Sequence, residues 1–224
     1  MSEVQILPAG DAAWLVEWPA RIDPAISGRA VAFADQAKHL NPAIRDVVVG
    51  YCSVTVYFDP LRVDGDDLAS HLRRLAANHS GVAETAGAEI DVDVCYGGEF
   101  GPDLADVAAR AGISEADVVE IHAGRTYRVY VVGFIPGFPY MASVDDRLAL
   151  PRRASPRLRV PAGSVAIAAG QTGIYPRETP GGWHLIGRTR VKPYDRSRVN
   201  PFLFKPGDRV RFRAIDRAQF EGMS

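Results

Sequence analysis

Three stretches between residues 133 and 189 decide how this chain folds: GFIPGFPYM at 133–141, LPRRASPRLRVPAGSVAIAAGQTGIYP at 150–176, and ETPGGWHLIGRT at 178–189. Glycine and proline recur in them at a density that neither a helix nor a regular sheet needs, and they mark tight turns. The apolar runs between the turns are too short for helices. We therefore predict short strands joined by rigid, shaped loops, the kind of segment on which binding groups are commonly mounted.

The same region carries an uneven charge. Residues 133–213 contain 15 Lys and Arg residues against 5 Asp and Glu, a net charge of +10, whereas the whole chain carries −1. A basic, loop-rich segment in an otherwise acidic chain favours an anionic ligand or an acidic partner surface. The alternative is that individual arginines lie on a solvated face of the molecule.

A group of polar side chains lies in the segment GQTGIYP at 170–176. Gln171, Thr172 and Tyr175 can each donate and accept hydrogen bonds, a combination that suits an amide or lactam ring. The glycines of the segment let the backbone turn tightly and let a ligand approach closely. The alternative is that Gln171 and Thr172 only satisfy backbone groups at the end of a barrel.

Two arginines and one histidine complete the candidate substrate- or anion-binding set. Arg157 and Arg159 precede the same strand, and a guanidinium group can form paired hydrogen bonds with a carboxylate or a phosphate. His184 follows two glycines and a tryptophan, and an imidazole there can act as acid, base or donor near pH 7. A hydrogen-bonded structural histidine is the alternative interpretation. We assign no catalytic residue from the sequence.

Several common kinds of catalytic site are missing from the sequence. It has no Gly-Lys pair and hence no Walker A phosphate loop, no GxSxG serine motif, no HExxH motif, and no cluster of histidines or carboxylates at metal-ligand spacing. We therefore expect no metal site on this chain. Cys52 and Cys95 lie far apart without further cysteines, which favours two free thiols over a disulfide or a zinc site.

The remaining sequence predicts two domains. Residues 1–82 predict a small α+β domain, in which two helices cover one face of an antiparallel sheet. Residues 88–224 predict a β-barrel or sandwich, and small residues without periodicity mark the linker between the domains. The predicted strands lie at 5–7, 12–18, 44–50, 53–59, 88–95, 126–134 and 209–215, and the predicted helices at 24–40, 66–78, 102–111 and 114–121.

The stretches quoted above also carry a family resemblance. GFIPGFPYM, RVPAGSVAIAAGQTGIYP and PGGWHLIGRT, in this order and spacing, resemble the small subunit of bacterial 5-oxoprolinase, a family also labelled allophanate hydrolase subunit 1. The resemblance continues through YGGEFGPDLADVAARAGIS at 96–114 and KPGDRVRFRAI at 205–215, and more weakly through PAGDAAWLVEW at 8–18. The family is similar to one half of the carboxyltransferase domain of urea carboxylase, and it includes inhibitors of a sporulation histidine kinase.

The resemblance implies a fold and an activity. It implies an N-terminal ferredoxin-like α/β sandwich and a C-terminal cyclophilin-like β-barrel. It also implies a subunit of a hydrolase that opens 5-oxo-L-proline to L-glutamate with ATP hydrolysis, where ATP is bound by the complex. The alternatives that stay open are an inhibitor of a sensor histidine kinase, which would do no chemistry, and a subunit of an allophanate or urea amidolyase-type hydrolase or carboxyltransferase.

The resemblance further implies a hetero-oligomer. The expected partner is a larger companion subunit that resembles the other half of the carboxyltransferase domain, together with a small-molecule substrate. We expect no nucleic-acid or membrane partner and a cytoplasmic location, since no secretory signal and no apolar run of the length of a membrane helix is present. Aromatic residues next to arginines are typical of interface centres, and we expect interface anchors among Phe134, Phe138, Tyr140, Tyr175 and Trp183. The alternative is that these aromatic residues fill the barrel core, which we expect of some of them.

Overall fold

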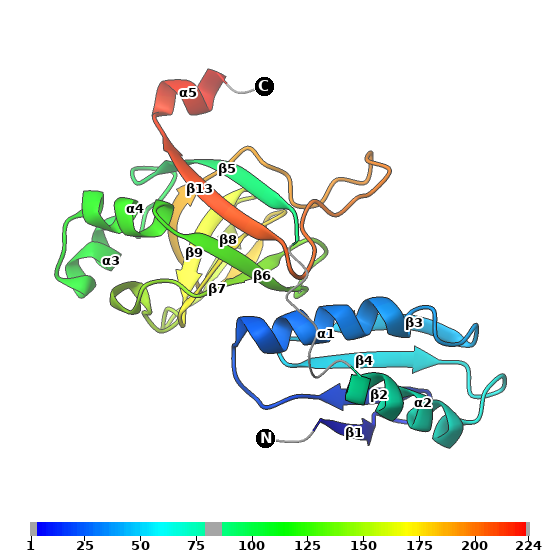
Figure 1. Cartoon of the computed structure of the whole chain (residues 1–224). Coiled ribbons are helices and arrows are strands. Elements are labelled where there is room, and N and C mark those ends of the chain that lie inside the picture. The colour runs from blue at the N-terminus through cyan, green and yellow to red at the C-terminus, as the bar shows by residue number, and fades with distance from the viewer. Residues whose placement is uncertain (1–3, 79–86, 223–224) are drawn as a thin grey trace. The chain divides into compact units, whose positions relative to one another are not determined.

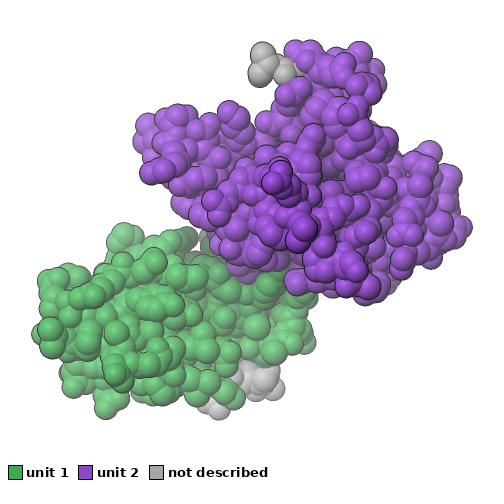
Figure 2. Space-filling view, turned by 180° about the vertical axis from the view of Figure 1, so that it is seen from behind, with its two compact units in different colours: residues 1–86 green, residues 87–224 purple. Residues whose placement is uncertain are grey.

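The computed structural model describes residues 4–78 and 87–222, and the chain divides into two compact units, 1–86 and 87–224 (Figure 2). Most of the predicted linker between residues 82 and 88 lies outside the described residues. Each unit combines helices with an antiparallel or mixed sheet, and the predicted α+β class is confirmed. Within the described residues, no helix is long and apolar enough to cross a membrane.

The first unit is a four-stranded antiparallel sheet with two helices. The strand order is β1-β2-β4-β3. From β2 to α2 the elements follow the βαββα order of a ferredoxin-like sandwich, and the edge strand beside β2 comes from the beginning of the chain. The elements are β1 (Gln5–Pro8), β2 (Ala13–Glu17), α1 (Pro24–Ala37), β3 (Ile44–Val49), β4 (Ser53–Phe58) and α2 (Gly65–Asn78).

Capping and apolar spacing explain how α1 forms and packs. The Asp23 side chain accepts hydrogen bonds from the Ala25 and Ile26 amides, and proline occupies the first helical position. Phe33 is fully buried and packs edge-on against Trp18 with ring centroids 5.6 Å apart. Both helices lie on the sheet (Figure 1), and their buried residues share one apolar core with alternate residues of the strands. The helix ends at Ala37, three residues before the predicted end.

The second unit is built on a closed seven-stranded barrel of order β10-β7-β6-β13-β5-β12-β9 (Figure 1). Its strands are β5 (Glu89–Tyr96), β6 (Thr126–Val132), β7 (Pro139–Ala142), β9 (Ser164–Ala168), β10 (Gln171–Ile174), β12 (His184–Arg188) and β13 (Arg209–Ile215). The short strands β8 (Arg157–Val160) and β11 (Thr179–Gly181) form a separate two-stranded ribbon. The predicted barrel is therefore present, and glycine-containing turns connect β6 to β7 and β9 to β10.

A parallel pair of strands, β5 and β13, brings the two ends of this unit together. They pair in register from Glu89 with Arg209 to Cys95 with Ile215. The outward residues form a row of ion pairs, in which Arg211 contacts Asp91 at 3.0 Å and Arg213 contacts Asp93 at 2.8 Å. Alternate residues such as Val92 and Phe212 point inward and are buried. The alternation of charged and apolar residues in both strands accounts for which side chains face outward and which face inward.

Short helices complete the second unit: α3 (Leu104–Ala111), α4 (Glu115–Ala123), the 3-10 turn η1 (Asp146–Leu148) and α5 (Arg217–Gly222). The α3–α4 pair packs beside the barrel, and its apolar residues join the barrel core (Figure 1). Ser114 and Asp117 form a reciprocal capping box at the beginning of α4. Asp117 therefore fills the position that Glu or Gln usually takes.

A chain of polar groups crosses the apolar barrel core. The His122 imidazole is fully buried between the Tyr96 hydroxyl, 2.8 Å from Nδ1, and the Thr172 hydroxyl, 2.9 Å from Nε2. Because the Thr172 hydroxyl donates its proton to the Ala166 carbonyl, it accepts from Nε2–H, and Nδ1 accepts from Tyr96. This arrangement needs a neutral ring, and burial lowers the pKa of His122 to about 3.

We predict that acid destabilises the barrel unit through His122. The unfolded chain takes up a proton at this histidine below pH 6.5, whereas the native ring stays neutral down to about pH 3. Stability therefore falls as the pH falls through this window, by about 2 kcal/mol between pH 7 and pH 5 from this group alone. Urea unfolding at several pH values should show a shallower pH dependence for His122→Gln than for the wild type. The exposed His71 gives the control: His71→Gln should keep the wild-type dependence, and an unchanged slope in His122→Gln would contradict the argument.

Candidate functional site

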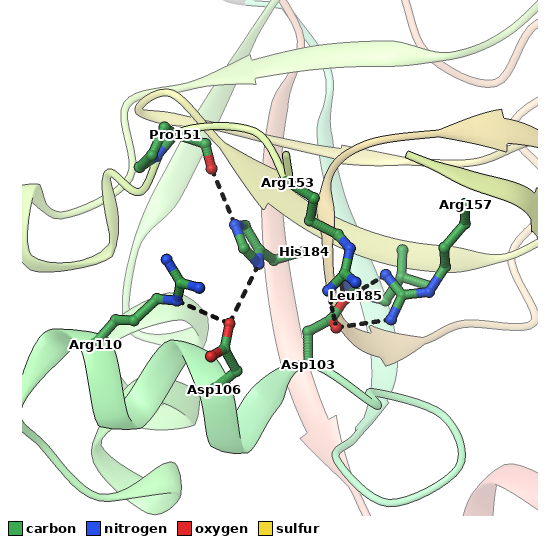
Figure 3. Close-up of polar contacts among 8 residues, drawn as sticks. All are labelled: Asp103, Asp106, Arg110, Pro151, Arg153, Arg157, His184 and Leu185. Atoms are coloured by element: carbon green, nitrogen blue, oxygen red, sulfur yellow. Dashed lines mark hydrogen bonds and ion pairs between the residues drawn. The ribbon is translucent and has the colours of Figure 1, made fainter. Parts of the chain in front are cut away.

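A buried carboxylate, Asp103, holds together the loop-rich part of the second unit. Its side chain is only 4% exposed, and it accepts hydrogen bonds from Arg153 Nη1 at 2.8 Å and from both terminal nitrogens of Arg157, at 2.8 and 2.7 Å (Figure 3). Both arginines belong to residues 151–157, the segment that leads into β8, which we call the arginine strap. The strap is therefore fixed to the beginning of α3 by paired, charge-assisted hydrogen bonds.

Asp103 is also tied to the barrel backbone. The Leu185 amide donates to its carboxylate at 2.7 Å, and the Asp103 amide donates in return to the Leu185 carbonyl at 3.0 Å. Burial acts to raise the pKa of Asp103, but the hydrogen bonds and charges of Arg157, Leu185 and Arg153 outweigh it and hold that pKa below its ordinary value. The carboxylate is therefore ionised at neutral pH, and its charge is balanced inside the protein.

His184 lies next to this cluster and faces two groups. Its Nε2 lies 2.9 Å from the Pro151 carbonyl, which can only accept, so Nε2 carries a proton. Its Nδ1 lies 4.0 Å from the Asp106 carboxylate and is buried, with no hydrogen-bond partner among the described residues (Figure 3). Asp106 itself is bonded to Arg110 at 2.9 Å. Nδ1 therefore carries a lone pair, which lies on the side of the ring that faces the Asp106 carboxylate.

The structure separates the six candidate residues rather than gathering them. Arg157 and His184 lie at the Asp103 cluster, and both already have protein partners. Thr172 is fully buried and lies inside the barrel between His122 and the Ala166 carbonyl. This corrects the expectation that Thr172 offers its hydroxyl to a ligand, because strand alternation turns it inward while Gln171 stays at the barrel end.

Two further candidates lie on the β8–β11 ribbon and at a barrel end. The Arg159 side chain is 81% exposed and lies 3.8 Å from Glu178, a loose surface ion pair. Gln171 is half-buried at the first position of β10, where it pairs with Ala142 of β7 and Ala168 of β9. Arg159 is therefore the member of the predicted set that is most exposed to solvent.

The aromatic residues expected at an interface instead form a small core of their own. Phe138, Tyr175 and Trp183 are at most 5% exposed, and Phe138 contacts both of the others edge-on. Burial also raises the pKa of the Tyr175 hydroxyl. The expectation that these three serve as interface anchors is therefore wrong. Tyr140 is half-buried, and Phe134 is the exposed member of the set at 63%.

Asp103, Arg153 and Asp106 are not among the residues that the sequence pattern indicated. A weak signal for Asp103 existed, because an acidic residue directly before an amphipathic helix commonly caps it. In the structure its side chain makes no cap hydrogen bond and turns to the strap instead. Among the described residues, no group of three or more His, Cys, Asp or Glu side chains is placed to hold a metal ion.

Comparison with known proteins places this chain in a family. The family model described as carboxyltransferase domain, subdomain C and D, matches residues 4–204, and the chain belongs to that family. It is 34% identical to the B subunit of 5-oxoprolinase from Bacillus subtilis (strain 168), over 96% of this chain and 95% of that protein. It is 38% identical to the protein of the same name from Haemophilus influenzae, over 93% of this chain and 97% of that protein.

Some further matches are shorter or lie within longer chains. The B subunit of 5-oxoprolinase from Escherichia coli O157:H7 is 56% identical over 55% of this chain. The match spans about half of that relative, 56% of its length. Among solved structures, TTHA0988 has a TM-score of 0.80 and 38% identity, and this chain covers 40% of it. The K. lactis urea amidolyase has a TM-score of 0.78 at 20% identity, with 15% of that chain covered, and it shares the fold.

We predict that Asp103→Asn strongly destabilises the second unit. The change removes the charge that balances two arginines, which are 31% and 25% exposed, and breaking such a pair from one side costs about 3 kcal/mol. Denaturant unfolding measures this loss. Asp106→Asn is the matched control, since its pair with Arg110 lies at the surface and contributes under about 1 kcal/mol. Equal effects of the two changes would show that Asp103 does not hold the strap.

Proposed function

We propose that this chain is a subunit of a cytoplasmic, ATP-dependent 5-oxoprolinase that opens 5-oxo-L-proline to L-glutamate. The observation that carries the proposal is the similarity to proteins named as the B subunit of 5-oxoprolinase, which extends over 93% or more of this chain at 34% and 38% identity. A match over both units at this level favours a shared role over a shared fold alone. The fold likeness to urea amidolyase is more distant, at 20% identity.

The chemistry of the reaction explains why ATP is needed. An unactivated lactam resists hydrolysis, because its carbonyl is stabilised by the ring nitrogen. Transfer of the γ-phosphoryl group of ATP to the lactam oxygen releases ADP and gives an O-phosphorylated lactam. Water then adds to the ring carbon, and cleavage of the carbon–nitrogen bond gives γ-glutamyl phosphate. A second water hydrolyses this acyl phosphate to glutamate and inorganic phosphate. The sequence has no Walker A motif, so we assign ATP binding to the complex as a whole.

Arg159 and Gln171 fit a role in holding the substrate. Arg159 has a largely exposed guanidinium with one loose carboxylate contact, which leaves it able to pair with the 5-oxoproline carboxylate. Gln171 has the donor and acceptor that a lactam N–H and C=O require. Arg157 and His184 act indirectly in this proposal, because their hydrogen bonds fix the strap that precedes the Arg159 strand.

A larger companion subunit completes the site in this proposal. The matches to longer proteins support it: this chain corresponds to 40% of TTHA0988 and 15% of the urea amidolyase, so the same fold recurs beside further protein in single chains. Among the described residues we find no nucleophile beside a free base. A chain that supplies substrate contacts to a shared site accounts for both observations.

Glutamate release tests the proposed function directly. The chain is assayed with 5-oxo-L-proline and ATP, alone and mixed with the companion subunits encoded beside it, and urea and allophanate serve as competing substrates. We expect glutamate, ADP and phosphate in equal amounts from the mixture, with dependence on this chain. Activity on urea or allophanate in place of 5-oxoproline would overturn the proposal, and so would 5-oxoprolinase activity that does not need this chain.

We predict that Arg159→Gln raises the KM for 5-oxoproline about tenfold or more, because a charged hydrogen bond to the substrate carboxylate is lost. The kcat should change less, since this contact is present in both ground and transition states. Steady-state kinetics of the assembled enzyme separate the two constants. Arg73→Gln, an exposed change in α2, should leave both unchanged. An unaltered KM in Arg159→Gln would remove Arg159 from the substrate site.

A further inference from the structure

Phe134 is presented to solvent by a strained but well-braced loop. It is 63% exposed and has a φ of +65°, a left-handed conformation that non-glycine residues rarely adopt. The loop is closed by hydrogen bonds from the Gly133 amide to the Phe138 carbonyl and from the Phe138 amide to the Ile135 carbonyl. The Phe134 ring also packs edge-on against the buried Phe138 ring. A bulky apolar side chain is thus held in one exposed position at a cost in backbone strain.

The same loop touches a basic hairpin, residues 192–205. Gly137 lies so close to it that a Cβ atom there would be 2.6 Å from the Cβ atom of Tyr194. The hairpin is closed by a bridge between Tyr194 and Phe202, whose ring centroids are 5.2 Å apart, and by a hydrogen bond from Arg198 to the Lys192 carbonyl. The loop that carries Phe134 and the hairpin are therefore in contact at Gly137 and Tyr194. Figure 1 shows the hairpin as an orange loop that projects from the barrel.

The hairpin combines positive charge with exposed apolar groups. It has four basic residues and one acidic residue, a net charge of +3. Val199 at its tip is fully exposed, and Phe202 is 39% exposed. Arg196 is exposed and has no carboxylate partner among the described residues, in contrast to Arg157 of the strap and Arg213 of β13. Aromatic side chains beside an unpaired arginine match the composition of protein interface centres.

We propose that Phe134 and the 192–205 hairpin form the docking surface for the larger companion protein, and that this partner offers an acidic patch around an apolar pocket. This rests on the proposed function, which supplies the partner. Phe134 would enter the pocket, while the hairpin charges steer association and fix the orientation. A protein partner is favoured over a polyanion such as RNA, because a strained, exposed phenylalanine contributes through burial and shape rather than through charge.

Binding measurements with the companion protein test the surface. Affinity is measured by biolayer interferometry at two salt concentrations, for the wild type, Phe134→Ala, and the double change Arg196→Glu with Arg198→Glu. We expect Phe134→Ala to weaken Kd at least tenfold, mainly through faster dissociation. The double change should slow association at least tenfold and remove most of its salt dependence. Circular dichroism and thermal unfolding confirm that each variant is folded.

Matched controls lie in the first unit. Leu61→Ala removes another exposed apolar side chain, 94% exposed, and Arg73→Glu with Arg74→Glu repeats the charge change on α2. Wild-type affinity in these controls, with loss in the hairpin and Phe134 variants, supports the proposal. Wild-type affinity in all variants, or equal loss in the controls, overturns it while the proposed function stands. Absence of both binding and activity in the wild-type mixture overturns the docking surface and the proposed function together. Binding of RNA through the hairpin that does not depend on Phe134 would assign the surface to RNA and would also overturn the docking proposal.

Discussion

One buried carboxylate fixes the loop-rich half of the barrel unit. Asp103 accepts hydrogen bonds from two strap arginines and from a β12 amide, so it joins α3, the strap and a barrel strand at a single point. The strap has little regular structure before β8, and it gains its order from these contacts and from the His184 bond to Pro151. Burying the carboxylate without the arginines, or the arginines without the carboxylate, would cost free energy. The contacts that join α3, the strap and β12 are therefore kept together or lost together.

The charge balance of the second unit follows from this arrangement. Two strap arginines pair with Asp103, and those of β13 pair with the carboxylates of β5. The net charge of +10 in residues 133–213 therefore overstates the positive field of the folded surface. Arg159 and the 192–205 hairpin are among the places where positive charge remains. An anionic substrate and an acidic partner can thus be recognised at separate places by one basic segment.

The sequence predicted the elements better than the site. The amphipathic helices and alternating strands lie within a few residues of their predicted ranges, because local periodicity determines them. The Asp103 cluster could not be found in this way, since its partners are 50, 54 and 82 residues away along the chain. Which polar residues of GQTGIYP face inward depends on how the barrel closes. Thr172 points to His122. From the local sequence, His122 is known only to follow the predicted helix at 114–121.

The places where the chain departs from local preference argue for surfaces that work in a larger assembly. Phe134 has a left-handed backbone conformation, which costs about 1–3 kcal/mol for a residue with a side chain. Its ring is not needed to fill the core, since Phe138, Tyr175 and Trp183 already pack against one another. The tight contact between Gly137 and Tyr194 ties this loop to a second exposed segment. The fold thus tolerates backbone strain that holds an exposed aromatic ring in place, whereas the buried Asp103 is paired with arginines. The strained apolar residue lies at the surface, where another protein can contact it.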